Sequence, residues 1–278
     1  MKKLFCIILA SVMALSLVAC GKSNGENSLE GNDSKTKNVE LVVFAAASMT
    51  ETMTKIKDMY EAKNQNVKII CTFESSGTLY DNIVNGAYCD IFISAAQKQM
   101  NQLDIEKDEK DNPQKNDFVL QGTRINLLEN KVALTVPDGN PKDINSFSDL
   151  LTDKISLLAI GNSSVPVGAY TIEILNYLGK PVDEFEKEGK VTYGSNVKQV
   201  TTQVKQGSVD AGIIYATDAF SANLEVVDLA TKDMCKQVVY PAAVINTTVN
   251  EDEAKEFLNY LTTDEAMKVF ESVGFSRA

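Results

Sequence analysis

Small hydrogen-bonding residues stand at four places where an apolar segment gives way to a helix-like one. The sequence reads "AAAS" up to Ser48, "ESSGT" around Ser76, "SSVPVGA" around Val167 and "YGSNV" up to Val197. Hydroxyl groups donate hydrogen bonds, and so do the free backbone N–H groups of a helix's first turn, where the helix dipole adds partial positive charge. Several such donors around one point would bind a small anion without any lysine or arginine.

Helix capping is the simpler interpretation of each motif taken alone. Ser48 and Glu51 fit the S-x-x-E capping pattern, and Thr78 and Asp81 fit the looser T-x-x-D pattern. Four-residue patterns of this kind are common. Their recurrence at successive strand-to-helix junctions favours a shared site, because the carboxyl ends of parallel strands meet at one edge of a sheet.

Strand-like and helix-like segments alternate along the chain, which predicts an α/β protein with mostly parallel sheets flanked by helices. We expect strands at residues 39–48, 67–73, 89–96, 131–137, 155–161 and 211–216. We expect helices at residues 49–63, 78–86, 170–179, 196–207, 251–262 and 264–274. Asp264 is the expected N-cap of the last helix.

The first twenty residues have the layout of a secretory signal, with Lys2 and Lys3 followed by an apolar run. The segment "LVAC" resembles the lipobox of bacterial lipoproteins, in which Cys20 carries lipid after cleavage. Residues 1–20 are therefore predicted to be a lipoprotein signal peptide, and residues 21–38, rich in Gly, Ser and Asn, a flexible tether. We expect an exported protein held by lipid on the outer face of the cytoplasmic membrane.

Composition excludes several classes of function. The formal net charge of −11 becomes −13 once Lys2 and Lys3 are removed, which disfavours nucleic acid as a partner. The chain has no histidine and no C-x-x-C motif, which excludes histidine-based catalysis and most His/Cys metal sites. Cys71, Cys89 and Cys235 allow one disulfide at most, and buried free thiols are the favoured interpretation. No cofactor is expected.

Several blocks of sequence together resemble the molybdate-binding protein family (ModA) of bacterial ABC importers. They are "VFAAASMTETM", "FESSGTLYDNIVNGAYCDIFISAAQKQM", "VPVGAY", "NVKQVTTQVKQGSVDAGIIYATDA" and "YPAAVI", in the family's order. The resemblance implies a two-lobed type II periplasmic-binding-protein fold, with two crossing strands and the ligand in the cleft between lobes. Lobe 1 would comprise residues 39–122 and 240–278, and lobe 2 residues 123–239.

The resemblance also implies five ligand-binding positions. The hydroxyls of Ser48, Ser76 and Tyr215 and the backbone N–H groups of Val167 and Val197 would donate to the oxygens of the anion. Molybdenum would be held only as its oxyanion, with no direct protein–metal ligand. From the residues alone, the Val197 side chain fits a helix core, and Tyr215 could equally be a packing tyrosine.

Three positions depart from the family's usual pattern: Val167 stands in place of alanine, Tyr88 in place of proline, and Glu74 lies two residues before Ser76. If residues 74–76 are extended, Glu74 and Ser76 share a face. A carboxylate there would repel a dianion, or accept a proton from hydrogen phosphate. We expect Glu74 to point into solvent at the rim of the cleft.

The predicted function is a monomeric, lipid-anchored receptor that captures molybdate, and tungstate with it, and delivers it to the permease of an ABC importer. A sulfate or phosphate receptor is the related alternative. An exported enzyme acting on a small anion is a further alternative, but no nucleophile elbow or motif-placed carboxylate pair supports it, so we expect no enzymatic activity. A surface adhesin or structural lipoprotein is the third.

Overall fold

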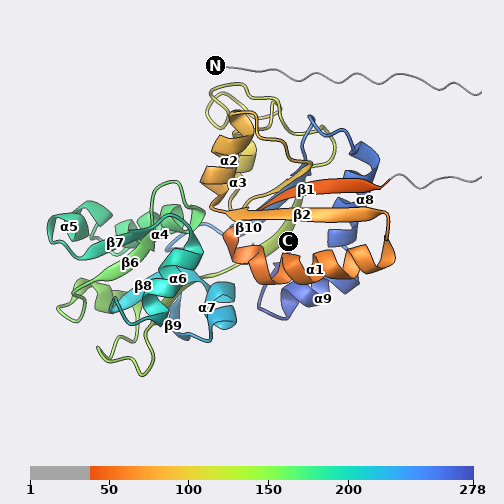
Figure 1. The fold of residues 1–278 in the computed structure, drawn as a ribbon. Helices are drawn as coiled ribbons and strands as arrows, with labels where there is room; N and C mark the ends of the chain where they lie inside the picture. The colour runs from red at the N-terminus through yellow and green to blue at the C-terminus, as the bar shows by residue number, and fades with distance from the viewer. Residues whose placement is uncertain (1–37) are drawn as a thin grey trace, which may run out of the picture. The chain divides into compact units, whose positions relative to one another are not determined.

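A computed structural model of the chain describes residues 38–278 (Figure 1). The predicted signal peptide, the lipidation site at Cys20 and the tether up to residue 37 lie outside the described residues. No helix within residues 38–278 is long and apolar enough to cross a membrane.

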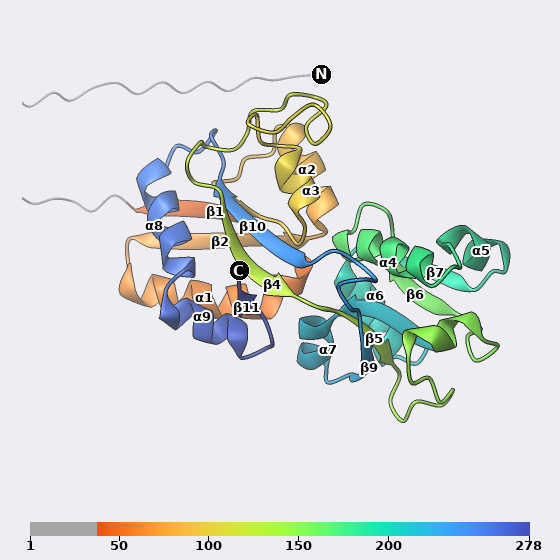
Figure 2. The same ribbon diagram turned by 180° about the vertical axis from the view of Figure 1, so that it is seen from behind.

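The first sheet has six strands in the order β11-β4-β10-β3-β1-β2. They are β1 (Val39–Ala46), β2 (Val67–Glu74), β3 (Ile91–Ile93), β4 (Ile125–Asn130), β10 (Val238–Val244) and β11 (Ser276–Arg277). β1 pairs in parallel with β2 and β3, whereas β10 runs antiparallel to β3 and β4. Figure 2 shows β10 and β4 side by side from behind.

Both faces of β1 are apolar, because helices cover the sheet on both sides. Leu41 and Val43 belong to one hydrophobic cluster, and Phe44 belongs to another. The first cluster includes residues of α1 (Thr50–Lys63), α8 (Glu251–Leu261) and α9 (Asp264–Glu271); the second includes residues of α2 (Ser76–Val84) and α3 (Gln97–Asn101). A strand buried on both faces reads as a continuous apolar run, which is why β1 could be predicted.

The second sheet has five strands in the order β7-β6-β8-β5-β9. They are β5 (Val132–Val136), β6 (Leu158–Gly161), β7 (Val191–Gly194), β8 (Ala211–Tyr215) and β9 (Glu225–Leu229), accompanied by α4 (Pro166–Tyr177), α5 (Val182–Lys187), α6 (Val197–Lys205) and α7 (Ala216–Ala222). β6 is parallel to β7 and β8, and β5 is antiparallel to β8 and β9.

The chain passes twice between the sheets. β4 leads through Lys131 directly into β5, and residues 230–237 connect β9 to β10. Because β4 pairs within the first sheet, placing all of residues 123–239 in the second lobe is wrong at this strand. The division into lobes otherwise stays a prediction.

Three local expectations also need correction. Both sheets are mixed rather than mostly parallel, because the strands next to the two connections run antiparallel to their neighbours. Ser48 lies in a short 3₁₀ turn, η1 (Ala47–Met49), and caps no helix. The N-cap of α2 is Ser75, which accepts from the N–H of Thr78, and not Thr78 itself. The N-cap of α9 is Thr263 and not Asp264, the residue that follows it.

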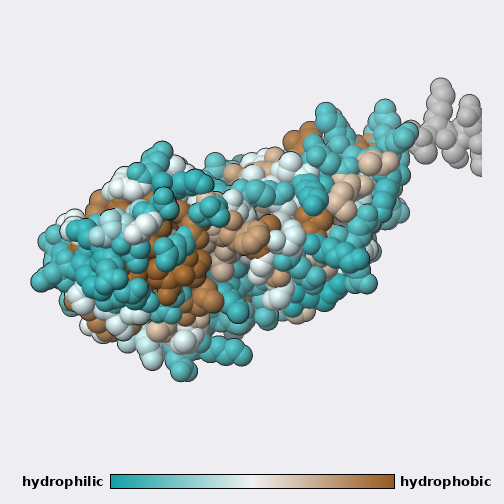
Figure 3. Space-filling model, turned by 90° about the horizontal axis from the view of Figure 1, so that it is seen from below, coloured by the Kyte–Doolittle hydropathy of each residue, from teal (hydrophilic) through white to brown (hydrophobic). Residues whose placement is uncertain are grey.

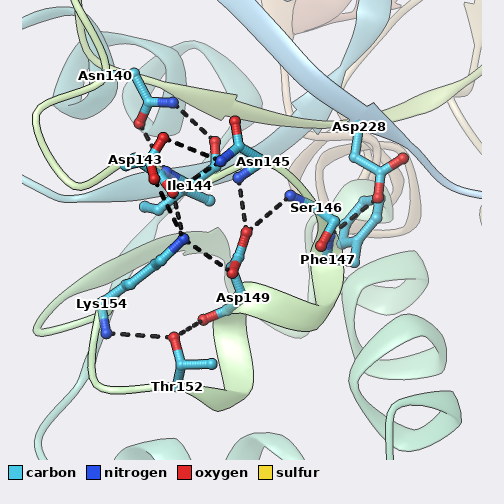
Figure 4. A network of polar contacts seen from close by, with 10 residues as sticks. All are labelled: Asn140, Asp143, Ile144, Asn145, Ser146, Phe147, Asp149, Thr152, Lys154 and Asp228. Atoms are coloured by element: carbon cyan, nitrogen blue, oxygen red, sulfur yellow. Dashed lines mark hydrogen bonds and ion pairs between the residues drawn. The ribbon is translucent and has the colours of Figure 1, made fainter.

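The loop between β5 and β6 carries a polar network around Asp149 and includes η2 (Phe147–Leu151), a second 3₁₀ turn (Figure 4). The Asp149 carboxylate accepts from the N–H groups of Asn145 and Ser146 at 2.7 and 3.1 Å and pairs with Lys154 at 3.1 Å. These contacts, the Asn145 N–H first, lower the pKa of Asp149. The network holds the loop in shape at the protein surface.

Apolar side chains on the surface are interspersed with polar ones. Figure 3 shows brown hydrophobic areas interrupted by teal hydrophilic ones on the face seen from below. The most exposed large apolar side chains among the described residues are Val249, Phe220 and Tyr177.

Candidate functional site

One small pocket is lined by elements of both sheets and contains about 190 Å³ of space, part of it open to solvent. The first sheet supplies the ends of β1, β2 and β3 and the start of α2; the second supplies the first turns of α4 and α6 and the end of β8. The lining residues are Ala46, Ala47, Ser48, Glu74, Ser75, Ser76, Ala95, Val165, Pro166, Val197 and Tyr215. None of these described residues is basic.

Four of the five predicted ligand-binding residues meet in this pocket: Ser48, Ser76, Val197 and Tyr215. Val167 does not line it, although the adjacent Val165 and Pro166 do. The Val167 side chain is fully buried in the core instead. Its role as a backbone donor stays a prediction.

Ser76 is the first residue of α2 and its hydroxyl oxygen accepts a hydrogen bond from the backbone N–H of Ala95 at 2.9 Å. A serine hydroxyl has one proton and two lone pairs. Because the Ala95 N–H can only donate, the Ser76 proton remains free to donate elsewhere. The neighbouring Ser75 caps the helix, so the Ser76 hydroxyl is not needed for capping.

Ser48 follows β1 and its Oγ lies 2.8 Å from the hydroxyl oxygen of Tyr240. Tyr240 in turn lies 3.2 Å from Nδ2 of Asn130. All three side chains are buried. A network in the core therefore holds the Ser48 hydroxyl at the pocket wall.

The second sheet contributes helix N-termini. Val197 is the first residue of α6, whose N-cap Asn196 accepts from the N–H of Gln199. The first N–H groups of a helix lack partners within the helix, so the Val197 N–H is available at the pocket. In α4, Pro166 has no N–H, and the Gly168 N–H donates to the carbonyl of Val165. The Val167 N–H belongs to the same first turn and, like that of Val197, has no acceptor within its helix.

Gly77 allows the two helix starts to approach one another. A Cβ atom at this position would lie 2.2 Å from the carbonyl oxygen of Ser164, just before α4. Gly168 plays a similar part within the second sheet, where a Cβ would lie 2.4 Å from the carbonyl oxygen of Gly161. Only glycine fits either place, so Gly77 lets the start of α2 lie against Ser164, and Gly168 lets α4 lie against the end of β6.

Tyr215 ends β8 and presents its hydroxyl in the pocket, 3.5 Å from the carbonyl oxygen of Ala95. This distance is at the outer limit of a hydrogen bond, so the proton is weakly held by its present partner. Burial raises the pKa of Tyr215 well above its ordinary value, which keeps the hydroxyl protonated and able to donate. Its ring also packs edge-on against Tyr170 and Tyr240, so packing and binding are compatible.

Glu74 lines the pocket and is half-buried, contrary to the expectation that it points into solvent. Its Oε2 accepts a hydrogen bond from Nδ2 of Asn196 at 3.1 Å. The physical reason is that the amide of Asn196 is oriented by its capping bond, which turns Nδ2 toward the carboxylate. The carboxylate is thereby held across from the start of α6.

Lys198 follows Val197 in α6, and its ammonium group forms ion pairs with two carboxylates. Its Nζ lies 2.7 Å from Glu51 of α1 and 3.1 Å from Oδ1 of the buried Asp218, although neither Asp218 oxygen accepts a hydrogen bond from the described residues. Burial raises the pKa of Asp218 to about 6, and Lys198 acts in the opposite direction. Burial alone would lower the pKa of Lys198, but Asp218 and Glu51 raise it overall. The lysine charge is therefore not directed at a ligand.

The described residues contain no cluster of three or more His, Cys, Asp or Glu side chains suited to a metal ion. Cys71, Cys89 and Cys235 are free thiols, as favoured from the sequence, and burial raises the pKa of Cys71 and of Cys235 to about 11.

Sequence reasoning missed the residues behind the pocket wall. Tyr240 lies in the quoted "YPAAVI" block, yet its contact with Ser48 joins positions 192 residues apart. Asn130 and Lys198 carried no signal of their own. Asn196 could have been found as the asparagine before the α6 pattern, because asparagine is a favoured N-cap.

Comparisons with known proteins show the family of the chain. Residues 41–276 match the family of bacterial extracellular solute-binding proteins. A Bacillus subtilis lipoprotein, YvgL, provisionally named an ABC transporter substrate-binding protein, is 37% identical over 279 residues and covers 99% of each chain. The molybdate-binding protein ModA of Escherichia coli is 33% identical over 245 residues, covering 85% of this chain and 89% of its own.

A solved structure shares the fold as well as the sequence. The substrate-binding domain of a molybdenum ABC transporter from Clostridium difficile, also provisionally named, is 33% identical with a TM-score of 0.64, covering 86% of this chain and 99% of the other. A sulfate-binding protein from Synechococcus elongatus matches at 24% identity over 300 residues, covering 97% and 81%.

These findings confirm the predicted resemblance and the type II periplasmic-binding-protein fold. The relatives are solute-binding proteins of transporters and not enzymes, so the prediction of a non-enzymatic receptor is confirmed. The chain belongs to the family of bacterial extracellular solute-binding proteins.

Proposed function

We propose that this protein captures molybdate, and tungstate with it, and delivers the anion to the membrane permease of an ABC importer. The observation that carries the proposal is the pocket in which Ser48, Ser76, Val197 and Tyr215 converge with no basic side chain among the lining residues. Hydroxyl and N–H donors of this kind suit a tetrahedral oxyanion, whose oxygens all accept hydrogen bonds. The relatives named for molybdate and molybdenum support the same ligand.

The anchoring part of the proposal rests on the N-terminal sequence. Cys20 follows "LVA" in the pattern of a lipobox, and YvgL, which matches along the whole chain, is named a lipoprotein. We propose attachment through Cys20 to the outer face of the cytoplasmic membrane, and a monomer that docks on the permease.

Sulfate is the second candidate ligand, favoured by the sulfate-binding relative. Sulfate and molybdate are both fully ionised at neutral pH and differ chiefly in size. Phosphate is disfavoured because it keeps a proton at neutral pH, whereas the pocket is lined mainly by donors; Glu74, which accepts from Asn196 through Oε2, is the one carboxylate of the lining that could accept this proton.

Calorimetric titration of the purified protein with molybdate, tungstate, sulfate and phosphate tests the proposal. We expect binding of molybdate and tungstate in the micromolar to nanomolar range, about −8 to −12 kcal/mol, with much weaker binding of the other two. Preferred binding of sulfate would reassign the ligand. Absence of heat from all four anions, together with unchanged resistance to trypsin in their presence, would refute an oxyanion receptor.

A further inference from the structure

A line of buried polar side chains stands behind Ser48 and is not part of the pocket lining. Ser48 Oγ lies 2.8 Å from Tyr240 OH, which lies 3.2 Å from Asn130 Nδ2; the same amide nitrogen is 2.9 Å from Thr217 Oγ1. Each of these four residues is at most 5% exposed. Because buried polar groups are almost always hydrogen-bonded, and each group here has few partners, the positions of the protons can be assigned.

The proton positions follow from one fixed donor. The backbone N–H of Lys131 can only donate, and it lies 2.8 Å from Oδ1 of Asn130. The Asn130 oxygen therefore faces Lys131, and its NH₂ group faces Tyr240 and Thr217. Because the NH₂ group only donates, the Tyr240 oxygen accepts from it, and the Tyr240 proton is left for Ser48. Ser48 then accepts from Tyr240 and its own proton is directed elsewhere.

We propose that Asn130 and Tyr240 are positioning residues that fix Ser48 as a hydrogen-bond donor toward the pocket, so that the site selects anions that carry no proton. This inference rests on the proposed function and deepens it. Burial raises the pKa of Tyr240 well above its ordinary value, so the hydroxyl keeps the proton that it gives to Ser48.

Ser76 supports the same selection by an independent contact. Its oxygen accepts from the Ala95 N–H, so its proton is also free for the pocket. With Ser48, Ser76 and the Val197 N–H all donating, an anion that retains a proton would bring an O–H group against a donor. Molybdate, tungstate and sulfate avoid this conflict at neutral pH, whereas hydrogen phosphate avoids it only if its O–H group faces Glu74, the one carboxylate of the lining.

The line also joins the two sheets. Asn130 is the last residue of β4, where the chain crosses, and Thr217 lies in the first turn of α7 beside the second sheet. Tyr240 lies on β10 of the first sheet. The line thus connects elements of both sheets, but the two residues that set the donor state of Ser48, Asn130 and Tyr240, both lie on strands of the first sheet.

The sharpest test is Asn130→Asp, which replaces the donating NH₂ by an accepting oxygen of nearly the same shape. Tyr240 would then donate to residue 130, its oxygen would accept the Ser48 proton, and Ser48 would present lone pairs to the ligand. We expect affinity for molybdate and sulfate to fall at least about tenfold, while affinity for phosphate falls less or rises. The measurement is competitive calorimetry with molybdate, sulfate and inorganic phosphate at neutral pH.

Two further variants keep the test informative if Asn130→Asp folds poorly. Tyr240→Phe removes the hydroxyl and leaves Ser48 free to donate or accept, so the phosphate-to-sulfate affinity ratio should rise by a smaller factor. Thr217→Val removes the other partner of the Asn130 amide but leaves the contact between Tyr240 and Ser48, so this ratio should not change.

Distinct outcomes separate this inference from the proposed function. Equal losses for every anion in Asn130→Asp and Tyr240→Phe, or an unchanged ratio, would overturn the positioning role and leave the receptor function standing. A Thr217→Val variant whose ratio shifts as much as that of Asn130→Asp would also contradict it. If the wild-type protein binds none of the anions, the proposed function fails and this inference falls with it.

Discussion

The two walls of the pocket offer the same kind of hydrogen bond by different means. The first wall, formed by residues of the first sheet's elements, offers the side-chain hydroxyls of Ser48 and Ser76. The second wall, formed by residues of the second sheet's elements, offers the first backbone N–H of α6, the adjoining start of α4 and a single side-chain hydroxyl, that of Tyr215. A hydroxyl rotates and needs buried partners to fix its direction, whereas a backbone N–H is directed by the helix itself.

This difference means that the two walls need different residue types. The first wall requires serine at its two positions and a supporting residue behind each hydroxyl, namely Tyr240 for Ser48 and the Ala95 N–H for Ser76. At the helix starts of the second wall the donor is the backbone, so a valine serves there as well as a polar residue; Tyr215 is the position in this wall that offers a side-chain hydroxyl. Charged networks such as the one around Asp149 (Figure 4) hold loops elsewhere, and the pocket lining contains only one charged side chain, Glu74.

Preventing the walls from meeting should have the largest effect. In Gly77→Ala the new Cβ would lie 2.2 Å from the Ser164 carbonyl oxygen, so the start of α2 could no longer approach the loop before α4. We expect ligand affinity to fall by about a hundredfold or more, with a smaller change in thermal unfolding, because the clash is confined to the start of α2 and the loop before α4. Calorimetry and circular dichroism would measure the two effects.

Asp81→Ala on the exposed face of the same helix is the matched control and should bind as the wild type does. Near-normal affinity of Gly77→Ala would show that the close approach of the walls is not needed for binding.

Truncating side chains in each wall should show whether the side chain or the backbone donates to the ligand. Ser48→Ala and Ser76→Ala each lose a hydroxyl and should weaken molybdate binding about 10- to 100-fold, since a bond to a charged group contributes about 1.5–3 kcal/mol. Val197→Ala keeps its N–H and should stay within about threefold of the wild type. Titration of the three variants side by side is the measurement, and equal losses from all three would contradict the distinction between the walls.

The pocket carboxylate should act against the donors of both walls. Glu74→Gln removes a negative charge from the lining and keeps an oxygen that can accept from Asn196. We expect affinity for a dianion to rise by about two- to tenfold, more at low than at high ionic strength. Asp81→Asn removes an equal charge away from the pocket and provides the control; weaker binding by Glu74→Gln would instead assign the carboxylate a supporting role.

The buried acid near the second wall should affect stability more than binding. The pKa of Asp218 is about 6 in the folded protein, above the ~3.9 of a free carboxyl group. Between these values the folded state binds more protons, so this group makes the free energy of unfolding fall as the pH rises from about 4 to about 6.

Asp218→Asn removes this dependence. The stability of the variant relative to the wild type should therefore rise over the same pH window, by on the order of 1–3 kcal/mol, and stay level above it. Urea unfolding at several pH values would measure it. Parallel pH profiles of the two proteins would contradict the shifted pKa, and binding at neutral pH should change by less than about threefold.

The sequence by itself determined the α/β class and most elements, because β1, β5 and β8 are apolar runs and helices such as α6 repeat apolar residues at helical spacing. It also indicated the binding motifs, since small polar residues at strand ends are local features. Strands β7 and β9 gave no such signal, because they are short and only partly buried.

Only the tertiary structure decided which polar residues share a site and what each one does. Whether Ser48 caps a helix or faces a pocket depends on Tyr240, and whether Glu74 faces solvent depends on Asn196, both of which lie more than a hundred positions away. The pattern of residue types along a short segment predicts burial and helix starts, because these depend mainly on neighbouring residues. The direction of a hydroxyl or the partner of a carboxylate depends on contacts across sheets, which spacing along the chain does not encode.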